Sequence, residues 1–370
     1  MKLAVVGAGI NGIMSAWALR DAGHEVDLYE QGEPMNATSR ASTKLLHGGL
    51  RYLEHGDFGL VREGLQARKW WLSQAPELAR SIEIAIPVYR GAGRGRWTLK
   101  AGLALYDLLA GRSRLCRHSW LDPESLNAQV RGLKSKHLRG AYVFCDGQMD
   151  DHALGMWALD RIRAMGVRLH ANLPVQMISL NGMLVTPQGR NQYDGIVNAS
   201  GPWAVALLER SNVKSHHKLA LIRGSHLLVP RRHDIGFLLE SPDDGRVCFI
   251  LPYGEHTLIG TTEVPQSADE PIVCSAYERN YLLRLYNAYF KPEIMDDQTI
   301  ATFAGVRPLV ATGQSDSSAI TRESAIEVQG KIATIFGGKW TTSRDTGLRV
   351  ANLIQDWGSS NRNQAKNSAD

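Results

Sequence analysis

Long apolar runs are missing from this sequence. No stretch approaches the ~20 consecutive apolar residues that a membrane-spanning helix needs. The first residues pass directly into a strand-like apolar pattern, so no cleavable export signal is recognisable. These absences argue against an integral membrane protein, and we expect a cytoplasmic location. Peripheral contact with the inner face of the cytoplasmic membrane stays open at this point.

Cysteine is also scarce. The four cysteines lie far apart and form no CxxC pair: Cys116, Cys145, Cys248 and Cys274. This spacing predicts neither a zinc site nor a disulfide framework, and we expect no metal. The formal net charge of +5 suits an anionic substrate, an anionic membrane surface or nucleic acid. Because the basic residues are not grouped with aromatic residues that could stack on bases, we expect no nucleic-acid partner.

The length and the composition indicate the number of domains and the class of protein. At 370 residues the chain exceeds a typical single hydrophobic core, and we expect two domains. The hydrophobic fraction of 44% and the charged fraction of 21% are ordinary for a globular protein. Both fractions exclude a fibre or a largely disordered chain, and we find no internal repeat.

The most informative pattern that is present lies near the N-terminus. Residues 3–6 form a short apolar run typical of a buried parallel strand, and a helical apolar pattern follows from position 13. Between them, Gly7, Gly9 and Gly12 have the GxGxxG spacing, which allows a tight turn against a pyrophosphate. Glu30, at the end of the next apolar strand, is placed to accept hydrogen bonds from a ribose. The pattern predicts a dinucleotide site but does not distinguish NAD from FAD.

One strongly apolar helix, expected at residues 99–110, lies between basic flanks. Such a segment can lie along an anionic bilayer. It can equally be a buried helix of a lobe inserted into the nucleotide-binding domain, and we favour this second interpretation. The basic residues concerned are Arg90, Arg94, Arg96, Lys100, Arg112, Arg114 and Arg117.

A second informative segment, residues 38–54, reads TSRASTKLLHGGLRYLE. It resembles the signature of FAD-dependent glycerol-3-phosphate dehydrogenases, within the D-amino-acid-oxidase-like flavoprotein superfamily. Further segments resemble the same family in the same order: residues 198–203, 223–226, 260–262, 305–308, 319–322 and 337–339. Together they cover nearly the whole chain, and the resemblance decides for FAD over NAD.

The resemblance implies an α/β fold with two domains. One is a Rossmann-type FAD-binding domain of the glutathione-reductase-like kind, expected at residues 1–80, 145–212 and 305–357. The other is a substrate-capping domain with a mixed or antiparallel β-sheet and helices, expected at residues 81–144 and 213–304. Residues 358–370 are polar and have little to bury, and we expect a disordered tail there.

The resemblance also implies where FAD is bound. A cation or a helix N-terminus favours the edge of the flavin that becomes anionic on reduction, and Gly338, Lys339 and Thr341 precede the last expected helix. The residues expected to bind FAD are Gly7, Gly9, Asn11, Gly12, Glu30, Ser39, Ser42, Lys44, Leu46, His47, Gly48, Gly49, Ala199, Gly201, Trp203, Gly305, Gly338, Lys339, Trp340 and Thr341.

For the substrate, the resemblance implies a phosphate held by arginines. Arg51, Arg307 and Arg322 come from distant parts of the sequence, and each guanidinium can donate two hydrogen bonds to a phosphate. Tyr52 is expected to add a hydroxyl or a wall beside Arg51. Oxidation of a secondary alcohol also needs a base, for which histidine is suited because it titrates near neutral pH. The residues expected to take part in the reaction are His47, His226 and Arg307, and the sequence does not tell which histidine is the base.

The implied function is oxidation of sn-glycerol 3-phosphate to dihydroxyacetone phosphate by hydride transfer to flavin N5. The electrons are expected to pass to quinone or another acceptor. Two alternatives stay open: an FAD-dependent dehydrogenase or oxidase of another small anionic alcohol or amine, and an FAD-binding partner or sensor protein without catalysis. Many members of the family continue into a helical C-terminal domain, which we expect to be missing here.

Overall fold

The computed structural model describes residues 1–91, 93–267, 270–311 and 324–367, with side chains described up to Gln355 and at Trp357. The chain forms two compact units. Unit 1 comprises Met1–Arg40, Asp151–Ile222 and Val306–Asp370, and unit 2 comprises Ala41–Asp150 and Arg223–Gly305. Two strands that pair with each other, β12 (Leu219–Pro230) and β17 (Ala301–Val310), carry the chain from one unit into the other.

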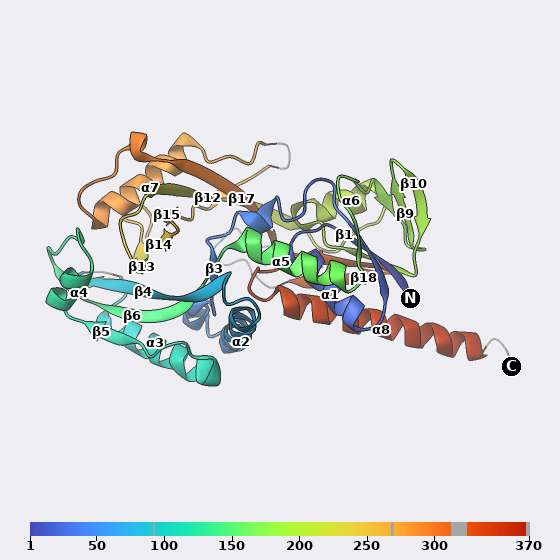
Figure 1. Ribbon diagram of the computed structural model, residues 1–370, viewed down its shortest axis with the longest axis horizontal. Coiled ribbons are helices and arrows are strands. Elements are labelled where there is room, and N and C mark those ends of the chain that lie inside the picture. Colours follow the sequence, from blue (N-terminus) through green and yellow to red (C-terminus); the bar gives the residue numbers. More distant parts are fainter. Residues whose placement is uncertain (92, 268–269, 312–323, 368–370) are drawn as a thin grey trace. The chain divides into compact units, whose positions relative to one another are not determined.

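A six-stranded sheet forms the centre of unit 1 (Figure 1). The strand order is β18-β19-β11-β1-β2-β7, and the pairing is parallel except between β18 and β19. The apolar run at residues 3–6 lies in β1 and is buried on both faces, as a central parallel strand requires. The strands are β1 (Lys2–Val6), β2 (Glu25–Tyr29), β7 (Arg168–His170), β11 (Gly195–Asn198), β18 (Ala325–Gln329) and β19 (Ile332–Phe336).

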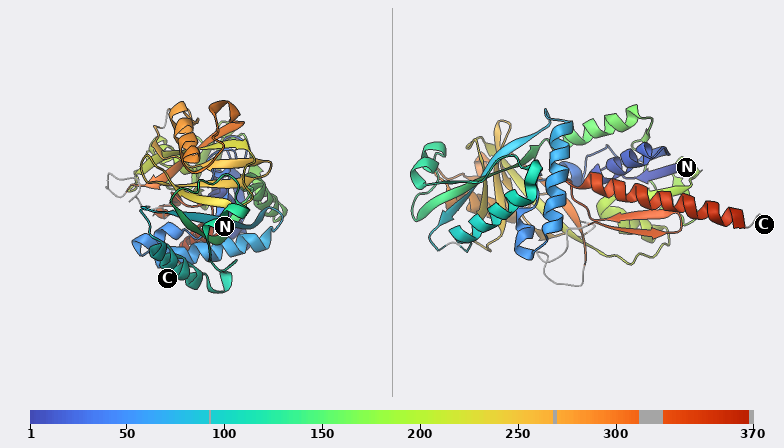
Figure 2. Two further views of the ribbon diagram at one scale, coloured as in Figure 1. Left: turned by 90° about the vertical axis from the view of Figure 1, so that its left-hand side faces the viewer. Right: turned by 90° about the horizontal axis from the view of Figure 1, so that it is seen from below.

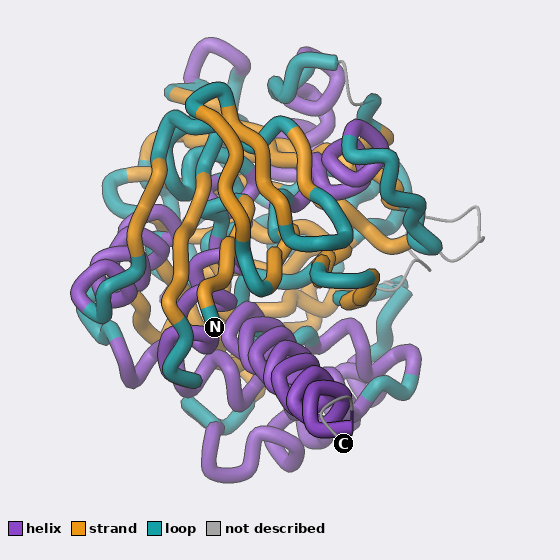
Figure 3. Tube along the Cα trace, turned by 90° about the vertical axis from the view of Figure 1, so that its right-hand side faces the viewer, coloured by secondary structure: helices purple, strands orange, loops and turns teal. Residues whose placement is uncertain are grey.

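Helices and a small second sheet cover the two faces of this sheet. Helix α1 packs against α5 and α8, and Figure 3 shows α8 as the long helix that leads to the C-terminus. On the other face, Ala4 and Val6 of β1 share a core with Leu184 and Leu207, which come from the antiparallel sheet β8-β9-β10 and from α6. The elements are α1 (Ile10–Asp21), η1 (Thr38–Arg40), α5 (Asp151–Ala164), β8 (Met177–Ile178), β9 (Met183–Thr186), β10 (Gly189–Gln192), η4 (Gly201–Trp203), α6 (Ala204–Arg210) and α8 (Ser343–Asn367).

Helix α8 corrects one prediction. The sequence predicts disorder from residue 358, whereas α8 continues to Asn367. Extending an existing helix is far less costly than starting one, and this part of the sequence contains the helix formers Arg362, Gln364, Ala365 and Lys366. The polar composition alone therefore predicts too short a helix.

A ten-stranded mixed sheet forms unit 2. Its main path is β16-β12-β15-β14-β13-β4-β6-β3, with β17 paired to β12 and β5 paired to β6. Most neighbours are antiparallel, and β13 and β4 are parallel. The remaining strands are β3 (Leu45–Leu46), β4 (Ala79–Tyr89), β5 (Ser119–Leu121), β6 (Leu138–Met149), β13 (Gly236–Glu240), β14 (Val247–Tyr253), β15 (His256–Gly260) and β16 (Val264–Pro265). This confirms the predicted fold class: a parallel Rossmann-type sheet in unit 1 and a mixed sheet in unit 2.

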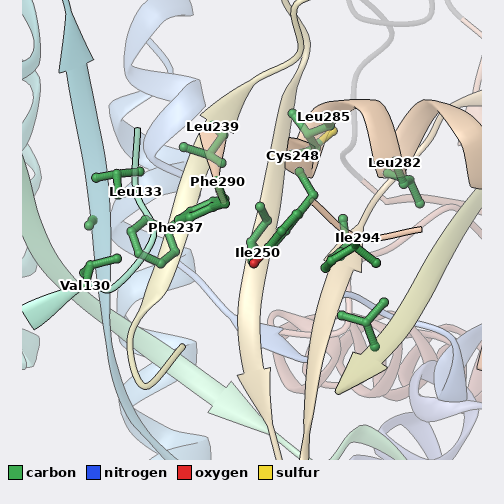
Figure 4. Packing of buried hydrophobic residues seen from close by; sticks show 14 of the residues in the cluster. Val130, Leu133, Phe237, Leu239, Cys248, Ile250, Leu282, Leu285, Phe290 and Ile294 are labelled. Carbon is green, nitrogen blue, oxygen red and sulfur yellow. The ribbon is translucent and has the colours of Figure 1, made fainter. Parts of the chain in front are cut away.

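The helices of unit 2 pack on both sides of this sheet. Helix α7 covers one core, in which the rings of Phe237 and Phe290 lie 5.0 Å apart beside Ile250 and Leu282 (Figure 4). Helices α2 and α3 pack against each other on a second core (Figure 2, right). The helices are η2 (Leu50–His55), α2 (Phe58–Gln74), α3 (Arg96–Ala110), η3 (Gly111–Ser113), α4 (Pro123–Gln129), α7 (Ala276–Tyr289) and η5 (Asp296–Gln298).

The boundaries of the units differ from the expected domain boundaries in one large segment. Residues 41–80, expected in the nucleotide-binding domain, belong to unit 2. The reason is pairing and packing, because β3 pairs with β6 and α2 packs on β4 and α3. Sequence periodicity carries no information on these partners.

A disulfide corrects the cysteine prediction. Cys116 and Cys145 are bonded, with their Cα atoms 5.6 Å apart, although 29 positions separate them. Cys145 lies in β6, and the loop after η3 brings Cys116 back to that strand, so sequence spacing could not reveal the pair. Cys248 and Cys274 are free thiols. Within the described residues, no cluster of His, Cys, Asp and Glu side chains could hold a metal ion, and no helix is long and apolar enough to span a bilayer.

Candidate functional site

The glycine turn of unit 1 joins β1 to α1. Gly7 has a φ of 102°, and its amide donates to Tyr29 O at 2.7 Å. A Cβ on Gly7 would lie 2.6 Å from Ala199 O, and a Cβ on Gly12 would lie 1.8 Å from Gly7 O. Neither position accepts a side chain, so glycine alone permits this approach of three backbone segments. The first amides of α1 have no acceptor inside the helix, which is the arrangement that binds a phosphate.

Glu30 and Ser39 close this turn. Glu30 Oε2 accepts from Ala8 N at 2.7 Å, and Oε1 accepts from Gly32 N at 3.1 Å. Ser39 Oγ accepts from Ile10 N, the first amide of α1, at 3.0 Å. Both side chains therefore lie at the turn and stabilise it through hydrogen bonds with backbone amides.

Asn11 and the segment after β19 meet at the N-terminal end of α1. Asn11 Oδ1 is buried and has no hydrogen-bond partner among the described residues. A Cβ on Gly338 would lie 2.7 Å from Asn11 Nδ2. Trp340 Nε1 donates to Ser39 O at 3.0 Å, and Thr341 is buried. The residues around Lys339 thus lie beside the glycine turn despite their distance in sequence.

The end of β11 adds a third segment to this place. Ala199 N donates to Val6 O at 2.9 Å, next to the glycine turn. Ser200 Oγ donates to Asn198 Oδ1 at 2.6 Å and holds the chain as it turns away from the strand. Unit 1 therefore brings together the following predicted residues: Gly7, Gly9, Asn11, Gly12, Glu30, Ser39, Ala199, Gly338 and Trp340. Gly201 and Trp203 follow on η4.

In unit 2, His226 and Lys44 share one aromatic environment. The imidazole of His226 stacks on Phe303 with 4.8 Å between ring centres, and Lys44 Nζ lies 4.9 Å from the centre of the same ring. Lys44 Nζ also lies 5.8 Å from the centre of the Tyr253 ring. His226 Nε2 is hydrogen-bonded to Thr43 Oγ1 at 3.0 Å. His226 and Lys44 are both buried, so their positions are fixed by packing as well as by bonds.

A buried carboxylate holds the strand that carries this histidine. Glu278 Oε1 accepts from Ser225 Oγ at 2.8 Å and from Thr262 Oγ1 at 2.7 Å. Glu278 Oε2 pairs with Arg223, whose Nη2 lies 3.0 Å away. Burial alone would raise the pKa of Glu278, but the hydrogen bonds it accepts, first of all from Thr262, hold it below its usual value. The 223–226 motif is therefore fastened to the first turn of α7.

The turn at residues 47–49 is anchored from inside unit 2. Gly48 N donates to Tyr106 OH at 3.0 Å, and Tyr106 OH donates to Asp146 Oδ2 at 3.0 Å. Asp146 Oδ1 forms an ion pair with Arg68 at 2.7 Å, and both side chains are almost fully buried. Burial raises the pKa of Tyr106 well above its usual value, so the hydroxyl keeps its proton. The Gly48 amide is therefore occupied within this network.

The other predicted residues of unit 2 surround this turn. Ser42 Oγ accepts from Lys44 N at 3.0 Å, and Leu46 is buried in β3. His47 is half-buried directly after β3, and Gly49 begins η2 with a φ of 77°. Gly305 lies on β17.

The three arginines fall into different parts of the chain. Arg51 lies on η2 beside Tyr52, and both are half-buried in unit 2. Arg307 is half-buried on β17, in the part of that strand that belongs to unit 1. Arg322 lies outside the described residues.

Sequence reasoning did not identify the residues that hold the predicted site residues in place through hydrogen bonds, ion pairs and ring contacts. They are Thr43, Arg68, Tyr106, Asp146, Tyr253, Thr262, Glu278 and Phe303. One signal was available: Ser275 and Glu278 have the S-x-x-E spacing of a capping box, and the box is formed at the start of α7. Thr43 and Thr262 lie inside the segments 38–54 and 260–262, but neither segment indicates their partners. The remaining residues have partners 40 or more positions away, which no local pattern marks.

A model of the FAD dependent oxidoreductase family, DAO, matches residues 2–344. The glycerol-3-phosphate dehydrogenase of Pseudomonas tolaasii is 35% identical over 366 residues, which cover 92% of this chain and 69% of that protein. The D-erythritol 1-phosphate dehydrogenase of Brucella abortus is 32% identical over 366 residues, which cover 94% of this chain and 72% of that protein.

The fold is similar to that of the glycerol-3-phosphate dehydrogenase from Bacillus halodurans in complex with FAD. The TM-score is 0.78 at 21% sequence identity, and the match covers 97% of this chain and 65% of that chain. The chain therefore spans between 65% and 72% of the length of these three proteins.

Proposed function

Because this chain belongs to the DAO family of FAD-dependent oxidoreductases, we propose that it oxidises sn-glycerol 3-phosphate to dihydroxyacetone phosphate. The observation that carries the proposal is the continuous match to a glycerol-3-phosphate dehydrogenase along 92% of the chain. Support also comes from the two units, because each keeps the residues expected at the cofactor or at the substrate in an organised local structure.

The residues of unit 1 fit the ADP half of FAD. The turn at Gly7 and Gly12 accepts no side chain, and the N-terminal amides of α1 suit a pyrophosphate. Asn11 Oδ1 is a buried acceptor that a ligand hydroxyl or a water could satisfy. When bound, FAD supplies the acceptor for the hydride that leaves the substrate carbon. We propose that Lys339 and Thr341 lie at the flavin edge that becomes anionic on reduction.

We propose His226 as the base that takes the proton of the substrate hydroxyl. Support comes from its immobility, since the ring is stacked on Phe303 and bonded to Thr43. A fixed imidazole suits general base catalysis because its geometry is set before the substrate arrives. As the hydroxyl proton goes to the imidazole, the hydride leaves the carbon that bears this hydroxyl, and the ketone forms. His47 is the alternative base, and the His226→Asn and His47→Asn variants compare the two directly.

We propose Arg51, Arg307 and Arg322 as the ligands of the substrate phosphate, with Tyr52 beside Arg51. A guanidinium binds two phosphate oxygens at once, which favours a phosphorylated alcohol over a neutral one. Replacement of a single arginine should weaken substrate binding while the flavin stays bound.

The decisive experiment follows the visible spectrum of the flavin without oxygen. We expect the yellow colour to bleach on addition of sn-glycerol 3-phosphate and to persist with glycerol. Bound flavin that no phosphorylated polyol reduces would contradict the proposed substrate and leave two alternatives, an enzyme for another small anionic alcohol or amine and an FAD-binding partner or sensor. A colourless protein that does not take up added FAD would contradict the cofactor.

A second substrate candidate is D-erythritol 1-phosphate. The similarity to the Brucella abortus enzyme, at 32% identity, favours it over other small anionic alcohols or amines. The same anaerobic titration separates the two candidates, because the preferred substrate reduces the flavin at the lower concentration.

We propose quinone as the electron acceptor, and we propose that the protein reaches quinone at the surface of an anionic bilayer. Support comes from α3, which buries one face through Leu103, Tyr106 and Ala110 and exposes the other. Trp97 is 73% exposed and Leu108 is 75% exposed. The exposed residues recur at helical spacing with basic neighbours: Arg96, Trp97, Lys100, Ala101, Ala104 and Leu108. Such a face can lie in the headgroup region of a bilayer.

The expectation of a buried lobe helix is thus correct for only one face of α3. Flotation with vesicles rich in phosphatidylglycerol tests the other face. We expect binding that weakens with salt and is lost in a Trp97→Ser, Leu108→Ser double variant. Tyr277→Ser is the matched control, because Tyr277 is 70% exposed on α7 of the same unit. Equal binding by the double variant and the control would remove α3 as the membrane contact.

A further inference from the structure

Arg94 lies in the glycine-rich stretch that precedes α3, and it joins two carboxylates of unit 2. Its Nε donates to Glu54 Oε1 at 2.5 Å, and its Nη2 donates to Glu54 Oε2 at 3.0 Å. Its Nη1 donates to Glu240 on β13. The guanidinium thus takes both oxygens of Glu54 in the forked geometry that is specific to arginine.

Glu54 lies on the same turn as Arg51. The helix η2 is a 3₁₀ helix, in which residues three positions apart lie on the same side. Glu54 is therefore on the side of Arg51, and the charge of Arg51 contributes to the lowered pKa of Glu54, after the larger contribution of the hydrogen bonds from Arg94. A carboxylate in this place competes with any anionic ligand for the Arg51 guanidinium.

We propose that Arg94 is a positioning residue for recognition of the substrate phosphate: it holds Glu54, so that Arg51 meets the phosphate and not its own neighbouring carboxylate. This inference rests on the proposed function, in which Arg51 binds the phosphate. Glu240 completes the arrangement by fixing the opposite side of Arg94, so the guanidinium cannot turn away from Glu54.

The test is a double-mutant cycle read as KM and kcat for sn-glycerol 3-phosphate. We expect Arg94→Ala to raise KM about tenfold, the effect of losing one charge-assisted contact, without changing kcat or the flavin content. We expect Glu54→Gln in the Arg94→Ala background to return KM to within about twofold of the original value, because the competing charge is gone. The inhibition constant of inorganic phosphate should change in parallel.

A purely structural role of Arg94 gives a different result. In that case the double variant keeps the high KM of Arg94→Ala, and the inference is wrong. Should Arg94→Ala fail to fold, Arg94→Lys keeps the charge without the fork, and Glu54→Gln must then lower the KM of that variant. Arg284→Ala is the matched control, because Arg284 forms a half-exposed pair with Asp243 at 2.6 Å in the same unit and should leave KM unchanged.

One further variant separates this inference from the proposed function. If Arg51→Ala leaves KM and phosphate inhibition unchanged, Arg51 does not bind the phosphate and the proposed function loses that ligand. If Arg51→Ala raises KM and Arg94→Ala does not, only the role of Arg94 is overturned.

Discussion

The two units organise their functional residues by different means. In unit 1 the candidate site is made largely by backbone: a turn without side chains at Gly7 and Gly12, and the N-terminal end of α1. In unit 2 the corresponding residues are held by buried side-chain networks, which lead from Gly48 to Arg68 and from Ser225 to Glu278. A site made by backbone tolerates no added atom at its glycines, whereas a site held by buried charges depends on partners that lie far away in the sequence.

The largest effect is expected where a buried charge loses its partner. Asp146→Ala leaves the buried guanidinium of Arg68 uncompensated and should lower the free energy of unfolding by about 3–5 kcal/mol. Hydrogen exchange of residues 45–55 should accelerate, because Tyr106, whose hydroxyl accepts from Gly48 N, loses the carboxylate that orients it. Asp160→Ala is the control, since Asp160 forms an exposed pair with Arg163 and should change stability by less than about 0.5 kcal/mol. Equal effects of the two variants would refute the difference drawn between buried and exposed pairs.

A single methyl group should disable the site made by backbone. Gly12→Ala places a Cβ 1.8 Å from Gly7 O, and we expect loss of bound FAD together with a destabilisation of about 3 kcal/mol. The flavin absorbance per protein and the urea unfolding curve measure both. Gly32→Ala is matched, because a Cβ at Gly32 meets nothing within 4 Å and should leave flavin content unchanged. Normal FAD binding by Gly12→Ala would show that the turn can open.

The contribution of Glu278, which holds the strand of His226, to the free energy of unfolding should depend on pH. The pKa of Glu278 lies below its usual value of 4.5, so its stabilising effect is complete above pH 4.5 and is lost as the pH falls through the lowered pKa. Glu278→Gln should therefore cost about 2 kcal/mol at pH 7 and progressively less below pH 4. Unfolding by urea at several pH values measures the difference. A cost that does not depend on pH would mean that the charge of Glu278 is irrelevant.

The smallest effect is expected from the hydroxyl beside the histidine. Thr43→Val keeps the shape of the side chain but removes the hydrogen bond to His226 Nε2, which contributes about 1 kcal/mol. Flavin reduction by substrate should slow about fivefold and its pH profile should shift, while the flavin content stays the same. An unchanged rate and profile would argue that stacking on Phe303 alone orients the imidazole.

Local spacing predicts unit 1 better than unit 2. The strand, turn and helix at residues 2–21 follow from apolar periodicity and three glycines, because every element there is specified within a few positions. The choice of FAD over NAD comes from the resemblance of several segments to a flavoprotein family, and the family match supports it. Glu30, at the end of the second strand, and Ser39 both accept hydrogen bonds from backbone amides at the turn.

The rest of the site could not be predicted because its partners are distant. Tyr106 reaches Gly48 across 58 positions, and Ser225 reaches Glu278 across 53. The same reason applies to the Cys116–Cys145 disulfide and to the assignment of residues 41–80 to unit 2. Neither could be predicted, because both depend on strand pairing. The end of α8 was predicted wrongly for another reason, because polar composition says little about how far a helix extends.

The threading of the chain through the two units has a consequence for synthesis. In unit 1, β1 pairs with β11 and β11 pairs with β19, so the sheet joins residues from both ends of the chain. At a ribosomal rate of about 5–20 residues per second, β1 waits for its sheet to be completed for roughly 15–60 s. During that interval one edge of the incomplete sheet is unpaired, first that of β1 and then that of β11, and it offers a binding site for a molecular chaperone on the nascent chain. The glycine turn, which the first dozen residues encode and which we propose to bind FAD, is thus completed only late in synthesis, because Ala199 and Gly338 lie beside it.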